Sequence, residues 1–213
     1  PMLSNYNSGK KDFDATLLHE ILNNAAKRKS FIAQLADSLH HYQLNGVNID
    51  FEELKEKNKE PLNIFQKELY ETLHAKGLTV TTDVAVDNDD YDFKSLSESN
   101  DYIILMAYDQ YNDASNPGPV SAQKWIEQKV DEAAKKIDPK KIILGIAGYG
   151  YKWTKDDEGK TTVASITYDE AINLAKIKKA PIDFDNDTYN LHFSYTDQEP
   201  TDDSTFETLH HQV

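Results

Sequence analysis

The chain contains no cysteine among its 213 residues. Disulfide bridges, thiolate metal sites and a cysteine nucleophile are therefore excluded. No apolar run approaches the length of a membrane-spanning helix, and no secretory signal peptide opens the sequence. The first residues, Pro1 to Asn5, are typical of a strand already under way, and the last ones, His210 to Val213, carry no polar tail. We therefore expect the sequence to be a segment of a longer protein.

Positive charge is also scarce. Lysine and arginine together number 23 against 37 aspartates and glutamates, which gives a formal net charge of -14. Nucleic acids and anionic membrane surfaces are bound through clustered lysine and arginine, so neither is an expected partner. A neutral polymer such as a polysaccharide makes no such demand. The length is sufficient for a sizeable core in one or two domains.

What the sequence does contain is an alternation of strand and helix patterns. Apolar spacing and capping residues predict helices over 14–23, 25–43, 61–76, 93–99 and 121–136. Strands are predicted over 1–5, 45–52, 78–86, 101–109 and 141–149, the last two as strands buried on both faces. This order predicts βαβ units and a parallel sheet in an α/β fold. Five strands fall short of the eight of a (β/α)8 barrel, so we predict a partial TIM barrel.

The pattern changes from about Thr154. Short runs rich in threonine, tyrosine and phenylalanine surround one predicted helix, over 168–179. We interpret residues 1–153 as the partial barrel and residues 154–213 as an incomplete α+β insertion.

One predicted strand carries a row of polar groups. The stretch from Asn45 to Glu52 reads N-G-V-N-I-D-F-E, in which apolar and polar residues alternate with the period of a β-strand. Asn48, Asp50 and Glu52 therefore project from one face, roughly 6.5 to 7 Å apart along the strand. On an ordinary solvated face this pattern carries no function. Facing into a barrel, it places a carboxylic acid at the C-terminal end of a strand, backed by a second carboxylate.

Two motifs resemble glycoside hydrolase family 18, the chitinase-like family. The stretch ending in Glu52 resembles its D-G-x-D-x-D-x-E signature, and Met106-Ala-Tyr-Asp109 resembles its M-x-Y-D motif. The segments 116–125 and 145–153 narrow the resemblance to a bacterial branch. Within it, the chain resembles most the family 18 domain of proteins that also carry a family 2 glycosyltransferase and a polysaccharide deacetylase. The resemblance implies barrel strands three to seven plus the start of the insertion domain.

The resemblance also implies a mechanism, in which the acetamido group of the substrate supplies the nucleophile. Glu52 would protonate the leaving oxygen, and Asp50 would hold the acetamido N–H and share a proton with Glu52. Tyr108 would donate a hydrogen bond to the acetamido carbonyl. Met106 and Asp109 would contact the sugar.

The match to the signature is incomplete at Asn45 and Asn48, where the family has aspartates. Asn48 lies behind Asp50 and could hydrogen-bond it but cannot take a proton from it, so activity could be low or the pH profile shifted. We include Asn48 among the substrate-binding residues. Asn5 and Tyr149 join it: Asn5 lies near the end of a predicted strand and could line the same cleft, and Tyr149 could stack on a sugar ring or serve only in packing. Asp83 lies near the end of another predicted strand and could line that cleft as well.

The resemblance implies a retaining glycosidase acting on β-1,4-linked N-acetylglucosamine polymers. The alternative is a non-hydrolytic carbohydrate-binding domain of a larger polysaccharide-synthesising or deacetylating protein. Loss of the terminal glutamate marks lectin-like family members, and Glu52 favours the enzyme. No metal or organic cofactor is implied: residues 183–187 mimic the start of a calcium loop, but Thr188 and Ser194 stand where the loop needs glycine and glutamate.

Two expectations concern the protein as a whole. An incomplete barrel leaves two open parallel edges, so we expect self-association or strand exchange between chains. The resemblance implies an extracytoplasmic location in a bacterium, as part of a membrane-anchored parent protein with further carbohydrate-active domains.

Overall fold

The computed structural model describes residues 1–54, 58–112, 114–200 and 206–212. The chain forms two compact units, of which the first comprises Pro1–Met106 and Val130–Gly145, and the second Ala107–Lys129 and Ile146–Val213. The predicted site residues divide between them. The first unit contains Asn5, Asn48, Asp50, Glu52 and Met106, and the second contains Tyr108, Asp109 and Tyr149.

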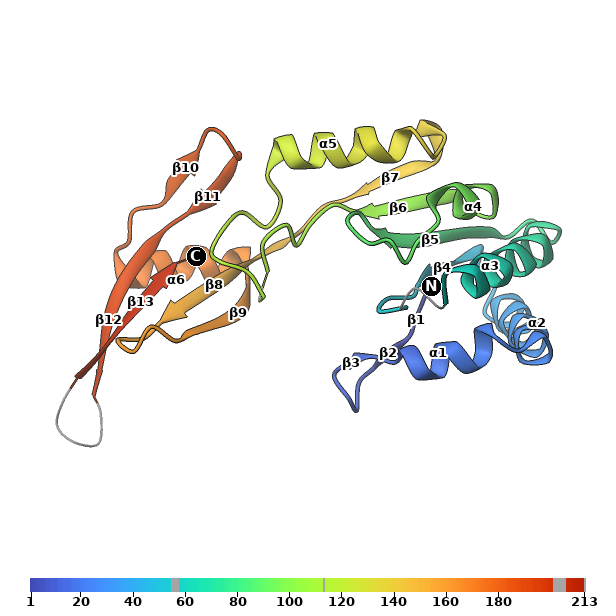
Figure 1. Cartoon of the computed structure of the whole chain (residues 1–213), viewed down its shortest axis with the longest axis horizontal. Helices are drawn as coiled ribbons and strands as arrows, with labels where there is room; N and C mark the ends of the chain where they lie inside the picture. Colours follow the sequence, from blue (N-terminus) through green and yellow to red (C-terminus); the bar gives the residue numbers. More distant parts are fainter. Residues whose placement is uncertain (55–57, 113, 201–205, 213) are drawn as a thin grey trace. The chain divides into compact units, whose positions relative to one another are not determined.

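Strands and helices alternate along the first unit, as predicted (Figure 1). The Asp14 carboxylate accepts hydrogen bonds from the backbone N–H groups of Thr16 and Leu17, which explains why the first helix begins there. The elements are β1 (Met2–Ser4), β2 (Tyr6–Asn7), β3 (Asp12–Phe13), α1 (Ala15–Leu22), α2 (Ala25–His41), β4 (Gly46–Asp50), α3 (Lys59–His74), β5 (Thr79–Ala85), α4 (Phe93–Glu98), β6 (Tyr102–Met106), the 3-10 turn η2 (Pro139–Lys141) and β7 (Ile142–Gly145).

Five of these strands form one sheet in the order β1-β4-β5-β6-β7. Every neighbouring pair is parallel. Helix α3 packs on β5 and helix α4 on β6, and the two helices also contact each other. The predicted α/β fold class, with a parallel five-stranded sheet of the partial-barrel kind, is therefore confirmed.

The core of this unit lies between the helices and one face of the sheet. Its best-defined helix is α3, whose predicted apolar stripe of Leu62, Phe65, Leu69 and Leu73 is at most 2% exposed. Along β4 and the two residues after it, Val47, Ile49 and Phe51 are buried and Asn48 and Glu52 are half-buried, as the alternation predicts, but Asp50 is buried as well. The rings of Phe51 and Phe65 lie 5.7 Å apart, so the end of β4 is anchored directly in the core.

Strand β7 corrects one prediction. The stretch 141–149 is not a single buried strand, because β7 ends at Gly145 and Tyr149 begins another strand. Ile143 and Leu144 are 43% and 39% exposed. The physical reason is position, since β7 is an edge strand of the sheet and has a strand neighbour on one side only. Self-association through the two edges stays a prediction.

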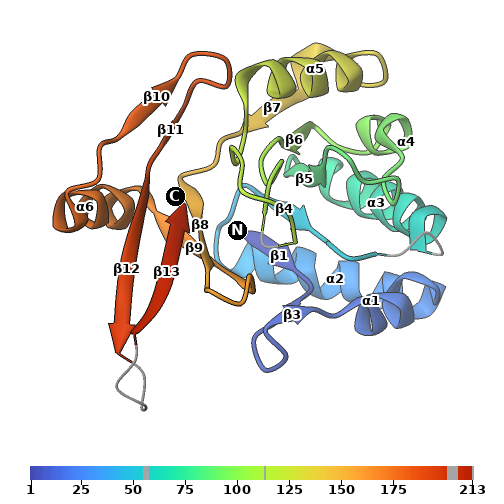
Figure 2. The same ribbon diagram turned by 60° about the vertical axis from the view of Figure 1, so that its left-hand side comes forward.

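The second unit is built on an antiparallel sheet in the order β12-β13-β8-β9 (Figure 2). Its helix α6 begins at a capping box, in which the side chains of Thr167 and Glu170 each accept from the other's backbone N–H. Trp153 and Phe193 are its largest buried side chains. Its elements are β8 (Tyr149–Lys155), β9 (Thr161–Thr167), α6 (Tyr168–Lys178), β10 (Asp183–Asp185), β11 (Asn190–His192), β12 (Ser194–Pro200) and β13 (Phe206–Gln212); α5 (Gln123–Ala134) begins in this unit and ends in the first.

The predicted domain boundary after Trp153 falls inside β8, which pairs with β9 and β13. A division at that residue stays a prediction. Within the described part of the chain, no helix combines the length and apolar character needed to span a membrane.

Candidate active site

Two carboxyl groups meet at the C-terminal end of β4. Asp50 is 8% exposed and lies opposite Ser4 in the parallel register between β1 and β4. Burial raises the pKa of Asp50, and interactions with the Ser4 and Glu52 side chains lower it by less, so the net shift is upward. Two carboxyl groups this close on one strand face cannot both ionise cheaply, so this arrangement favours a pair that shares a single proton.

The backbone at Glu52 is held by Asn5. Asn5 Nδ2 donates to the Glu52 carbonyl oxygen at 2.9 Å, and the Glu52 N–H donates to Asn5 Oδ1 at 2.9 Å. Asn5 is 7% exposed, so these bonds are sheltered from water. The Asn5 side-chain amide therefore pairs with the Glu52 backbone in the way that a neighbouring strand would, just beyond the end of β4. This gives Asn5 a positioning role for Glu52, and direct contact with substrate stays a prediction.

A buried tyrosine that the sequence analysis missed supports the same place. Tyr91 Oη donates to the Phe51 carbonyl oxygen at 2.8 Å, and the residue is 6% exposed. Its pKa is raised above the ordinary value, first by burial and then by the negative charges of Glu52 and Asp50. Tyr91 lies in the acidic stretch 87–92 that follows β5. The one signal that could have identified it is an aromatic residue in an otherwise polar loop.

Asn48 and Asp83 form a second polar pair on the same face of the sheet. Asn48 Nδ2 donates to Asp83 Oδ2 at 2.6 Å, and Thr81 Oγ1 donates to Asn48 Oδ1 at 2.7 Å. Asp83 is 8% exposed. Burial raises its pKa, the hydrogen bond from Asn48 lowers it, and the charge of Asp50 raises it further, to a final value of about 6. Asn48 thus bonds to β5, a contact that the sequence analysis did not anticipate.

Met106 is the last residue of β6. It is half-buried, and its register partners are Ala85 on β5 and Gly145 on β7. The small partners on both sides leave its side chain room at the end of the sheet. Its predicted contact with a sugar stays a prediction.

In the second unit, Asp109 is held by two phenols. Tyr149 Oη and Tyr151 Oη donate to Asp109 Oδ1 at 2.5 and 2.7 Å. Asp109 itself has a φ of +58°, a left-handed conformation that is costly for a residue with a side chain. Burial, followed by the hydrogen bond to Asp109, raises the pKa of Tyr149. The Tyr108 ring packs edge-on against Tyr149 with centroids 6.2 Å apart, so the predicted residues of this unit form one cluster.

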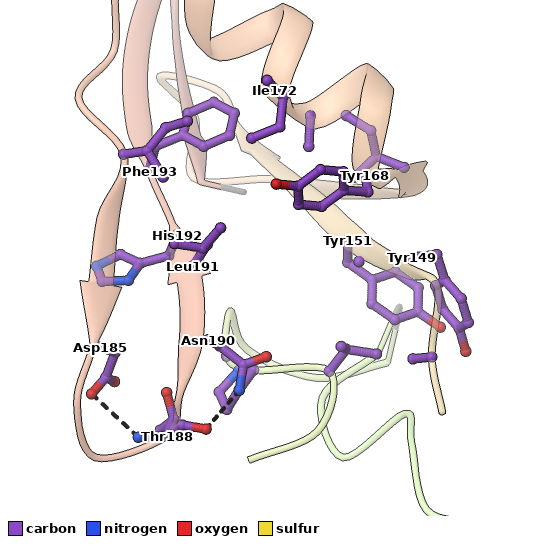
Figure 3. Close-up of a pocket in the computed structure, with 18 of the residues that line it drawn as sticks. Tyr149, Tyr151, Tyr168, Ile172, Asp185, Thr188, Asn190, Leu191, His192 and Phe193 are labelled. Atoms are coloured by element: carbon purple, nitrogen blue, oxygen red, sulfur yellow. Dashed lines mark hydrogen bonds between the residues drawn. The ribbon is translucent and has the colours of Figure 1, made fainter. Parts of the chain in front are cut away.

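The same unit contains a cavity of about 630 Å³ (Figure 3). Tyr149, Tyr151 and Tyr168 stand along one side of it, and the β10–β11 hairpin forms another. At the hairpin turn, Asp185 accepts from the Thr188 N–H and Asn190 donates to the Thr188 carbonyl oxygen. Asp185 therefore stabilises a turn. Among the described residues, no group of three or more histidine, aspartate and glutamate side chains is placed to hold a metal ion.

Barrel enzymes place their catalytic groups at the C-terminal ends of the strands of a parallel sheet, and this carboxyl pair lies at such an end. Comparison with known proteins agrees with this class. The model for "Glycosyl hydrolases family 18" matches residues 8–210, so the chain belongs to that family. The family part of the resemblance found in the sequence is thereby confirmed.

Individual relatives are more distant. The chain is 29% identical over 206 residues to the uncharacterized glycosylase YvbX of Bacillus subtilis, covering 92% of this chain and 59% of that one. It is 25% identical over 189 residues to the cortical fragment-lytic enzyme of the same organism, covering 84% and 44%. Among solved structures, a chitinase from Chromobacterium violaceum superposes with a TM-score of 0.82 at 26% identity, over 98% of this chain and 65% of the other. The chain thus spans about half the length of the curated relatives it matches.

Proposed function

We propose that this domain hydrolyses β-1,4-linked N-acetylglucosamine polymers with retention of configuration. The observation that carries the proposal is the pair of carboxyl groups at the end of β4, in which Asp50 is buried and interacts with the half-buried Glu52. An acid catalyst for a glycosidic oxygen must hold its proton near neutral pH, and a neighbouring carboxyl group favours that. Relatives named as a cortical fragment-lytic enzyme and a chitinase support this class of substrate.

In the proposed reaction, Glu52 gives its proton to the leaving oxygen as the glycosidic bond breaks. The acetamido oxygen of the same sugar attacks the anomeric carbon and forms an oxazolinium ion, as in family 18 generally. Asp50 accepts a hydrogen bond from the acetamido N–H and stabilises the positive charge. Water then attacks the anomeric carbon and opens the oxazolinium ring, and its proton passes to Glu52. Asn5 and Tyr91 keep the backbone of this segment in place.

Tyr108 and Asp109 enter the proposal through their motif. Tyr108 would orient the acetamido carbonyl, and Asp109, fixed by two phenols, would contact the sugar together with Met106. A carbohydrate-binding domain without turnover is the second candidate function. It is favoured by the cavity of the second unit, because tyrosine rings are common surfaces for sugar rings, and by Asn48 at a signature aspartate position.

We further propose that the parent protein carries a family 2 glycosyltransferase and a polysaccharide deacetylase. An extracytoplasmic location in a bacterium, with a membrane anchor on the parent, belongs to the same proposal. It is supported by the segments 116–125 and 145–153 and by bacterial relatives.

The test is cleavage of N-acetylglucosamine oligomers by the parent chain that contains residues 1–213, followed by anomer-resolved NMR. Retained-anomer products should form, and Glu52→Gln should lower kcat at least about 100-fold. Glu71→Gln, which removes an exposed carboxylate from α3, is the matched control and should leave kcat unchanged. Tight oligomer binding without turnover would favour the binding domain. Neither binding nor turnover would refute the sugar assignment.

A further inference from the structure

Asp83 is a buried carboxyl group that the proposed mechanism does not yet use. In the parallel register, Asn48 lies opposite Thr81 and Ile49 opposite Thr82, so the next residues, Asp50 and Asp83, share one level of the sheet. Asp83 is as buried as Asp50, at 8% exposed. The charge of Asp50 acts on it directly. The two carboxyl groups therefore belong to one electrostatic cluster.

Position 48 is an asparagine, so it adds no carboxyl group to this cluster and instead bonds to Asp83. Its carbonyl oxygen accepts from the Thr81 hydroxyl, which turns its Nδ2 toward Asp83. An ionised aspartate at position 48 could not donate to Asp83, and two adjacent carboxylates would repel each other. Asparagine at position 48 therefore allows Asp83 on β5 to be the acidic group, in place of an aspartate at position 48 itself.

The neighbours of Asp83 define which groups titrate with it. On β6, Ile104 lies opposite Asp83, and on β1, Ser4 lies opposite Asp50. Neither of these side chains titrates in the relevant range. The charges that act on the nearby Tyr91 identify the rest of the cluster, which is Glu52, Asp50, Asp90 and Asp83. All four charges act on Tyr91, whose hydroxyl reaches the Phe51 carbonyl between Asp50 and Glu52.

We propose that Asp83 is a positioning residue of the reaction centre: its negative charge makes the Asp50–Glu52 pair retain its single proton to higher pH. This rests on the proposed function. When Asp83 ionises, a further negative charge on the pair becomes more costly, so the acid catalyst stays protonated. Asp83 neither donates to nor accepts from the substrate, and the proton transferred in the reaction remains that of Glu52. The acidic group that the family signature places at position 48 is thus supplied from the neighbouring strand.

The variant that tests this is Asp83→Asn, which keeps the shape and can still accept from Asn48. The alkaline limb of the kcat profile should move down by about one pH unit, because a neighbouring like charge has been removed. On that limb kcat should fall about tenfold, while kcat near pH 5 and KM at all pH values stay within about twofold. The exchange Asn48→Asp with Asp83→Asn returns the carboxyl to β4 and should restore the alkaline limb. Thr79→Val, at the exposed start of the same strand, is the control and should leave the limb in place.

A second measurement does not depend on turnover. Carbon-13 NMR of labelled aspartate and glutamate carboxyls in the parent chain follows the titration of the Asp50–Glu52 pair, which should also move down by about one pH unit in Asp83→Asn. An unmoved titration, or an equal loss of kcat at every pH without a shift, would overturn the role of Asp83. Absence of turnover in the unsubstituted protein, or activity that survives Glu52→Gln, would instead refute the proposed function. The two failures are thus distinct.

Discussion

The buried Asp83 carboxyl makes a prediction about stability that is independent of catalysis. Its pKa is 3.8 in an unperturbed side chain and about 6 in the folded protein. An acid whose pKa is raised by folding favours the folded state while it is protonated, and that stability is lost as the pH rises through about 6. Replacing Asp83 by asparagine keeps a neutral side chain at every pH, so the variant should not lose this contribution.

The magnitude follows from the size of the shift. A difference of about 2 pKa units corresponds to about 3 kcal/mol at 1.36 kcal/mol per unit. Asp50 lies in the same cluster with a raised pKa of its own, so the two groups titrate together and share the effect. We therefore expect the free energy of unfolding of Asp83→Asn, relative to the unsubstituted protein, to increase by about 1 to 3 kcal/mol between pH 3.5 and pH 7.5.

The assay is urea unfolding followed by far-ultraviolet circular dichroism at intervals across this range. Asp37→Asn, which removes an exposed carboxylate from helix α2, reports the general effect of one charge. The reasoning is refuted by a difference between Asp83→Asn and the unsubstituted protein that stays constant with pH. It is equally refuted by a difference of the opposite sign at pH 7.5, which would mean that the charged form of Asp83 stabilises the fold.

Two further predictions concern contacts that hold the first unit together. Arg28 donates two hydrogen bonds of 2.9 Å to Glu68, which join α2 to α3, and a third of 2.7 Å to the Leu22 carbonyl oxygen. Arg28→Met should therefore lower the free energy of unfolding by about 2 kcal/mol in urea titrations. Lys27→Met is the exposed control, and equal effects of the two variants would contradict the structural role of Arg28. Tyr91→Phe leaves the Phe51 carbonyl without its buried donor and should lower the free energy of unfolding by about 1 to 2 kcal/mol. A loss no greater than that of Tyr42→Phe, at an exposed position, would show that water replaces the hydrogen bond.

Local pattern was sufficient for most of the architecture. The stripe on α3 and the alternation on β4 depend on neighbours a few residues apart, and the structure has both where they were predicted. The cap at Asp14 is equally local. The prediction that β7 is buried was wrong because the exposure of a strand depends on which strands lie beside it, and no short-range pattern contains that information.

The sequence by itself determined that this chain has a parallel α/β sheet and that β4 ends in two carboxyl groups, since both follow from the period of the side chains along an element. Only the tertiary structure decided what surrounds those carboxyls. Asn5 reaches Glu52 across 47 residues, Tyr91 reaches Phe51 across 40, and Asn48 reaches Asp83 across 35. Such pairs form because the parallel register brings distant segments to one level of the sheet, and burial there then raises the pKa of Asp50 and of Asp83.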